Sequence, residues 1–155
     1  MELKDLKKEY GLLEKKHNLP SFKELNEDFE IDKIDKESDC LLRVVRKVMM
    51  EKIVNSLTFI ETLINPINAP RIYFLYIKTM PQDDKKELDR IYKVLTDLTL
   101  ESLSLEIDHE EKNEAELVIK LHKKWNELKP GFKQILENMK KPGVPESEKS
   151  KSYFG

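Results

Sequence analysis

At 155 residues the chain has the length of one domain, and it is long enough to bury a hydrophobic core without disulfides or metal ions. Charged residues make up 37% of the sequence at a net charge of −2, and the single cysteine, Cys40, excludes an internal disulfide. The N-terminus carries no apolar run, so we expect no secretory signal and no membrane anchor, and predict a cytoplasmic protein.

The balance of charged residues is unusual. Lysine outnumbers arginine 24 to 4, and glutamate fills 20 positions. Heat-adapted proteins build surface ion-pair networks from such a mixture, and a genome that favours lysine and isoleucine produces the same bias. A thermophilic source is therefore one of two explanations for this composition.

Two short amphipathic helices are expected at the start of the chain. The first covers residues 2–17, where apolar positions and one histidine recur at spacings of 3 and 4. These positions are Leu3, Leu6, Tyr10, Leu13 and His17. Ser21 and Glu24 then form an S-x-x-E capping box, which predicts the start of a second helix that places Phe22, Leu25 and Phe29 on one side.

The stretch from Asp39 to Ile64 predicts a long helix at the centre of the fold. Its apolar side chains cover roughly half of the circumference of a helix with 3.6 residues per turn, so we expect neighbours on two or more sides. Asp35 should mark its start and Asn65 its end. Its uncharged runs are too short to cross a bilayer, and the stem of Lys52 should lie along the core with its ammonium group in solvent.

Residues 72–77 are six consecutive apolar or aromatic residues, so periodicity does not distinguish a helix from a strand. We predict a short buried helix that begins near Pro70, because a lone strand would leave its backbone groups unpaired. If Tyr73 and Tyr76 are instead exposed, they are the first candidates for a protein-binding surface, since aromatic rings with a polar group suit interfaces.

Two more helices are predicted after Pro81. The first has an apolar stripe that begins at Leu88, and the alternation of apolar and polar residues over 103–108 is interpreted as its end or as an extended linker. A cap at Asp108 or Asn113 should start the last helix. Pro130 should break or kink that helix, whose stripe then continues to Lys141.

These elements predict an all-α fold, a single-domain helical bundle of five or six helices around the long central helix. The domain should cover residues 1–141, and residues 142–155 should form a disordered C-terminal tail. The charge alternates along the chain: residues 81–111 carry ten acidic and four basic residues, and residues 112–141 carry four acidic and eight basic residues. We therefore expect an acidic helix to pack against a basic one.

Two Glu-x-x-His pairs, Glu14 with His17 and Glu106 with His109, are candidates for a metal site. Ferritin-like bundles use such pairs to hold two metal ions, because the i, i+3 spacing turns both ligands to one face. Both pairs lie near helix ends among charged residues rather than in a dry interior, so we predict no metal ligands here.

Basic side chains form two clusters that could contact phosphates. Acidic residues are interspersed among them, so a solvated helix face is the competing interpretation. The candidates for nucleic-acid binding are Arg43, Arg46, Lys47, Lys120, Lys123, Lys124, Lys129 and Lys133.

The last residues carry an aromatic pair, Tyr153 and Phe154, which we consider as a docking peptide beside the alternative of an inert tail. The pair resembles the aromatic end of sliding-clamp-binding peptides. Ser150 stands where those peptides carry an aliphatic residue and Ser147 where they carry glutamine, so the resemblance covers two residues and assigns no family.

The sequence has no glycine-rich phosphate loop, no Gly-x-Ser-x-Gly motif and no cysteine–histidine arrangement, so we predict no catalytic function and no cofactor. We expect a non-catalytic helical adaptor or accessory subunit that acts through protein–protein binding, with no membrane partner. The alternative is a nucleic-acid or ribonucleoprotein-associated accessory factor that uses the lysine-rich helix face. A ferritin-like metal-binding bundle is the remote alternative.

Overall fold

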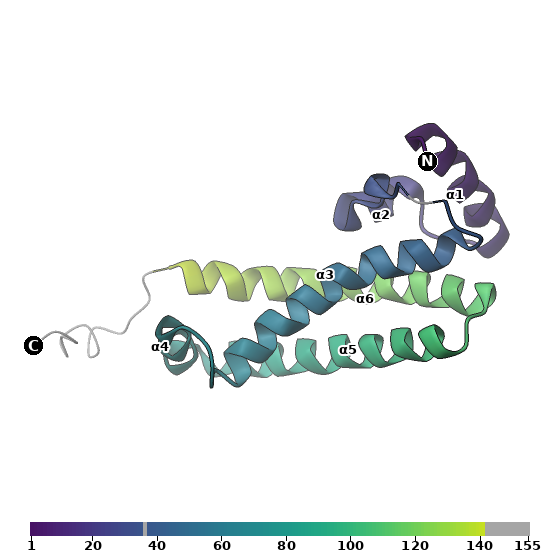
Figure 1. Ribbon diagram of the computed structural model, residues 1–155. Helices are drawn as coiled ribbons and strands as arrows, with labels where there is room; N and C mark the ends of the chain where they lie inside the picture. The colour runs from purple at the N-terminus through teal and green to yellow at the C-terminus, as the bar shows by residue number, and fades with distance from the viewer. Residues whose placement is uncertain (36, 142–155) are drawn as a thin grey trace, which may run out of the picture.

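The computed structural model describes residues 1–35 and 37–141, and within them the fold is all-α, as predicted (Figure 1). The six α-helices of these residues are α1 (Leu3–His17), α2 (Phe22–Phe29), α3 (Leu41–Ile64), α4 (Arg71–Thr79), α5 (Gln82–Ile107) and α6 (Glu111–Lys140), and a 3-10 turn, η1 (Ile31–Lys33), follows α2.

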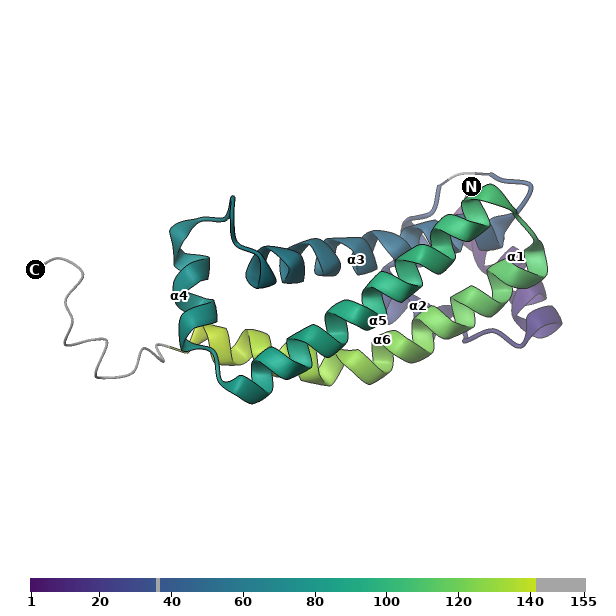
Figure 2. The ribbon, with the colours of Figure 1, turned by 90° about the horizontal axis from the view of Figure 1, so that it is seen from below.

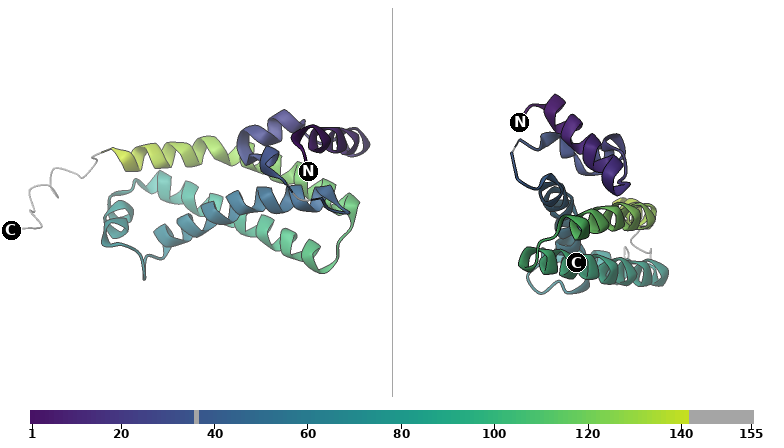
Figure 3. Two further views of the ribbon diagram at one scale, coloured as in Figure 1. Left: turned by 45° about the horizontal axis from the view of Figure 1, so that its top comes forward. Right: turned by 90° about the vertical axis from the view of Figure 1, so that its right-hand side faces the viewer.

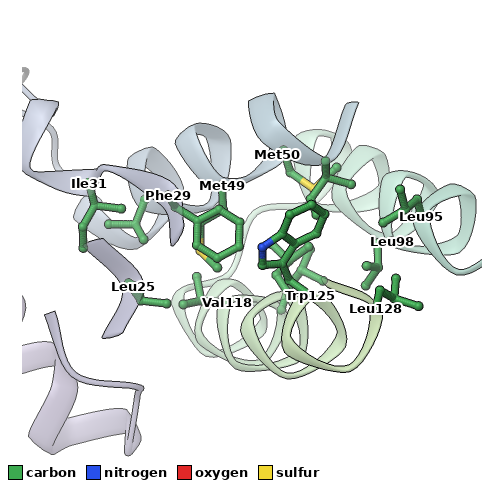
Figure 4. Close-up of a cluster of buried hydrophobic side chains, with 14 of the residues drawn as sticks. Leu25, Phe29, Ile31, Met49, Met50, Leu95, Leu98, Val118, Trp125 and Leu128 are labelled. Carbon is green, nitrogen blue, oxygen red and sulfur yellow. The ribbon is translucent and has the colours of Figure 1, made fainter. Parts of the chain in front are cut away.

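The long helices α3, α5 and α6 pack against one another and form the core, and α3 also contacts each of the shorter elements. Figure 4 shows how side chains from α2, α3, α5 and α6 meet around Trp125. Fully burying one aliphatic side chain contributes about 1.5–3 kcal/mol, so this shared cluster is the main stabilising feature of the fold. The expectation that the helix ending at Ile64 is a hub of the bundle is therefore confirmed.

The start of α3 differs from the prediction, because the helix begins at Leu41 rather than near Asp35. The hydroxyl of Ser38 accepts a hydrogen bond from the Cys40 N–H at 3.2 Å. A serine side chain that binds the backbone in this way favours a turn over a helix. The carboxylates of Glu37 and Asp39 consequently precede the first helical turn.

The capping box of α2 is present as predicted. The Glu24 N–H donates to Ser21 Oγ, and the Ser21 N–H donates to a Glu24 carboxylate oxygen at 2.7 Å. Leu25 and Phe29 are buried, and α1 joins them through Tyr10, whose hydroxyl donates to the Pro20 carbonyl at 2.6 Å. Local hydrogen bonds and buried anchors therefore fix α1 and α2 on the core.

The ends of α5 and α6 decide between the alternatives that the sequence left open. Helix α5 continues through the alternating residues to Ile107, so their interpretation as the end of this helix is confirmed. The predicted break at Pro130 was wrong, because α6 runs through this residue. Pro130 is exposed between the buried Leu128 and Phe132, so packing on both sides holds the helix although the proline removes one backbone hydrogen bond. The N-cap of α6 is Glu110, rather than Asp108 or Asn113.

The segment after Pro70 is a helix, as predicted, but its predicted burial was wrong. Every one of the 9 residues of α4 is exposed or half-buried. Ile72 and Phe74 are 47% and 51% exposed. The six consecutive apolar or aromatic side chains of α4 project from all sides of the helix. A short helix on the surface of a bundle can bury only one of these sides.

Candidate protein-binding surface

Helix α4 lies at one end of the long helices, beside the start of α5 and the end of α6 (Figures 1 and 2). It follows Pro70, and Pro81 separates it from α5. These prolines set the two ends of α4. Pro70 has the backbone angle suited to the start of a helix, and Pro81 cannot continue the helix that precedes it.

Tyr73 attaches α4 to α3. Its ring meets the ring of Phe59 edge to face at a centroid distance of 6.2 Å, and the ring centroids of Tyr73 and Tyr76 are 6.1 Å apart. Phe59 in turn contacts Phe132 of α6. Tyr73 is therefore half-buried as the anchor of α4, so the exposure that would make this tyrosine a candidate binding residue is met only in part.

Another side of α4 borders a cleft of about 430 Å³. Ile72, Leu75 and Tyr76 line one wall, and Met139 of α6 lines the other. At its polar edge, Asn138 Nδ2 donates to an Asp84 carboxylate oxygen at 3.0 Å. We call Ile72, Phe74, Tyr76 and this cleft the α4 surface.

The α4 surface can bury apolar side chains of another protein. Ile72 and Phe74 present large side chains to solvent, and Tyr76 adds an aromatic ring with a hydroxyl group. Aromatic residues are enriched at the centres of protein interfaces, and tyrosine is among the residues that contribute most of the binding free energy there. The exposure of Ile72 and Phe74 was not predicted from the sequence. Their place in an uninterrupted apolar run was the available signal, because a short surface helix cannot bury all of its sides.

The first predicted basic cluster does not form a free surface, because Arg46 is 1% exposed. Its guanidinium donates to the buried Glu114 carboxylate, to Ser102 Oγ at 2.6 Å and to Glu106 Oε1 at 2.7 Å. His109 Nδ1 lies 3.0 Å from Glu114 Oε1. This buried network joins α3, α5 and α6, and a phosphate cannot reach its arginine.

Arg43 and Lys47 also face Glu106, at 3.1 Å and 3.6 Å. Hydrogen bonds from Arg46 and Arg43 lower the pKa of Glu106 to about 2. Burial acts to lower the pKa of Arg46, but its hydrogen bonds to Glu114 and Glu106 outweigh this effect and raise the pKa above its ordinary value. These contacts join the acidic helix α5 to basic side chains of α3, and α5 also packs against the basic helix α6, where Lys120 contacts Glu101.

The second basic cluster lies on α6 and is largely paired. Lys120 contacts Glu101, Lys124 lies 3.5 Å from Glu127, and Lys129 lies 2.8 Å from Asp28. Lys123 and Lys133 are exposed. Lys52, by contrast, follows the prediction: its ammonium group is exposed and lies over the rings of Phe29 and Trp125.

The two Glu-x-x-His pairs are engaged with other residues. His17 Nε2 lies 2.8 Å from Glu111, and Glu106 is held by the arginines of α3. Across residues 1–35 and 37–141, no group of three or more histidine, cysteine, aspartate or glutamate side chains is placed to hold a metal ion.

Among the helices that the structure describes, none has the length and apolarity needed to cross a bilayer. Tyr153, Phe154 and the predicted tail lie outside the described residues. Comparisons with models of protein families, with curated proteins and with solved structures found no match.

Proposed function

We propose that this protein is a non-catalytic helical adaptor or accessory subunit that binds a protein partner through the α4 surface. The observation that carries this proposal is the exposure of Ile72 beside a cleft that Leu75 and Tyr76 also line. The half-exposed ring of Phe74 adds a second apolar side chain on another side of the same helix, which Tyr73 fixes to the core. Clustered apolar exposure of this kind marks interaction surfaces, whereas single exposed aliphatic residues are common on any protein.

Affinity purification from cells that produce the protein, after nuclease treatment, tests this function. A variant with Ile72→Asp and Phe74→Asp should lose the protein partner that the wild type retains, because a carboxylate in the interface would be desolvated without a counter-charge. Leu12→Asp is the matched control, since Leu12 is 66% exposed on α1, at the other end of the molecule. Retention of the same partner by the α4 variant would refute the proposal.

The nucleic-acid alternative has weaker support, because three of the five lysines in the α6 cluster form ion pairs within the protein. Retention on RNA or DNA that falls steeply with salt, and that is lost on reversing Lys123 and Lys124 to glutamate, would favour this alternative. A protein partner that survives nuclease treatment would favour the adaptor.

A further inference from the structure

Helix α5 carries two apolar stripes, and only one of them faces the core. The inner stripe is buried and consists of Leu88, Ile91, Leu95, Leu98 and Leu105. The outer stripe consists of Leu100, Leu103 and Ile107, which are 57%, 55% and 89% exposed. Spacings of three and four residues place these three side chains on the same face of the helix.

The outer stripe lies on the uncovered side of α5. Helix α5 packs against α3 and α6 through its inner stripe, and no other helix among the described residues lies over its outer side in the view of Figure 2. A helix at the surface of a bundle normally presents polar residues on this side. Packing within the described part of the chain therefore does not explain three large aliphatic residues in a line.

The hydroxyl groups next to the outer stripe already have partners in the helix. Thr96 Oγ1 donates to the Tyr92 carbonyl at 2.8 Å, and Ser104 Oγ donates to the Leu100 carbonyl at 3.2 Å. A hydroxyl group that donates a hydrogen bond to a carbonyl of its own helix keeps this bond when water is removed. Its desolvation therefore costs less free energy than that of a hydroxyl group bound only to water. This face of α5 can consequently be dehydrated by a partner at low cost.

Acidic groups border the outer stripe. Asp97 and Asp108 are exposed, and within the described part of the chain neither forms an ion pair. Between α5 and α6, a groove of about 470 Å³ has Leu105 and Leu117 among its lining residues, together with three carboxylates and one lysine. The lysine, Lys120, is paired with Glu101, which leaves the carboxylates of Asp108 and Glu116. An apolar stripe beside carboxylates favours a ligand that is apolar in the middle and basic at its margins.

We propose that the outer stripe of α5 docks an amphipathic helix of another protein, whose apolar side is flanked by lysine or arginine residues. A second copy of this chain would place acidic margins against acidic margins, and like charges at an interface oppose binding. The same acidic margins repel nucleic acid and anionic membranes. This site is separate from the α4 surface, so the protein would bridge two partners.

Two synthetic helical peptides of about 20 residues provide the test. Both place leucine and isoleucine at the i, i+3, i+4 and i+7 positions, and they differ only in lysine or glutamate at the flanking positions. Fluorescence anisotropy measures their binding to the full chain at low salt. The lysine-flanked peptide should bind about tenfold or more tightly than the glutamate-flanked peptide, and added salt should weaken its binding.

Variants of the full chain locate the binding site. Leu103→Asp with Ile107→Asp should weaken binding of the lysine-flanked peptide by about tenfold or more, and so should Asp97→Lys with Asp108→Lys. Leu12→Asp should leave the binding unchanged. All of these positions are exposed, and circular dichroism confirms that each variant is folded.

Three outcomes would overturn the proposal. These are the absence of binding by the lysine-flanked peptide, equal binding of both peptides, and binding that survives the Leu103 and Ile107 substitutions. Sedimentation that shows a wild-type dimer, dissociated by Leu103→Asp, would assign this face to a second copy of the chain instead. Because Ile72 and Phe74 are untouched in these variants, the result is independent of the function proposed for the α4 surface.

Discussion

The two ends of the long helices are covered by short helices in different ways (Figure 3). At one end, α1 and α2 insert Leu6, Tyr10, Leu25 and Phe29 into the core, each at most 4% exposed. At the other end, Tyr73 and Ile77 of α4 pack against the core, and every apolar residue of this helix stays exposed or half-buried.

The difference follows from where the apolar residues stand in each helix. In α2 they are spaced so that one side is apolar, and that side faces the core. In α4 the apolar residues are consecutive, so their side chains project from all sides of the helix and only one side can be buried. At these two ends, the spacing of the apolar residues along a helix therefore determines whether they are buried. The number of apolar residues in the helix does not.

The hydrogen-bond network around Arg46 adds to the difference between the two ends, because it lies at the end that α1 and α2 cover. It joins the start of α3 to the end of α5 and the start of α6. A buried ion pair contributes little net stability compared with an apolar pair, but it is costly to break because the remaining charge is left without its partner. This end of the molecule should therefore tolerate substitutions poorly.

The largest effect is expected from removing an anchor of α1. Tyr10→Ala should lower the free energy of unfolding by about 4 kcal/mol, because it leaves a cavity in the core. Tyr10→Phe should cost about 1 kcal/mol, since it removes only the hydrogen bond to the Pro20 carbonyl. Urea unfolding followed by circular dichroism measures both values. A small loss for Tyr10→Ala would mean that α1 is not fixed to the core.

Glu114→Ala should lower the free energy of unfolding by about 3 kcal/mol, because it leaves Arg46 buried without its main counter-charge. The double variant Arg46→Met with Glu114→Leu should be more stable than the single variant, since it removes both charges and retains apolar volume. Thermal unfolding of both variants at one pH compares them. A double variant less stable than Glu114→Ala would contradict this explanation.

The same network predicts the response to acid. The pKa of Glu106 is about 2 in the folded protein, against an ordinary value of 4.5, so its stabilising effect is complete above about pH 4.5 and is lost as the pH falls toward 2. We expect about 1 kcal/mol from this group, because solvent screens a partly exposed carboxylate. Glu106→Gln should therefore be less stable than the wild type at pH 7, and this difference should disappear near pH 2.

The smallest effect on stability is expected at the opposite end. Phe74→Ala should change the free energy of unfolding by less than about 0.5 kcal/mol, because the ring is half exposed and its loss leaves no cavity. Urea unfolding beside Tyr10→Ala provides the comparison. A loss as large as that of Tyr10→Ala would show that Phe74 is part of the core.

Much of the fold could be predicted because its signals are local. The capping box at Ser21, the helix end at Asn65 and the start after Pro81 depend on hydrogen bonds and backbone angles within a few residues. The start of α3 could not be placed by the same reasoning, since the Ser38 side chain competes with helix formation just before Leu41.

The buried network was missed although its spacing was visible. Arg46 lies four residues after Leu42 and three before Met49, and Glu114 lies four before Val118, so each charge stands on an apolar side of its helix. A charged residue in such a position predicts a partner of opposite charge. Which partner it meets depends on how α3 and α6 cross, and the sequence does not specify that angle.

Native-state hydrogen exchange of the full chain tests the contrast between the two ends most directly. Amides of α1, α2 and the start of α3 should exchange only through opening that costs close to the global free energy of unfolding, while those of α4 should exchange through local opening at a much lower cost. Equal protection of α4 and α2 would contradict the account, because it would show that α4 is held to the core as firmly as the buried helices.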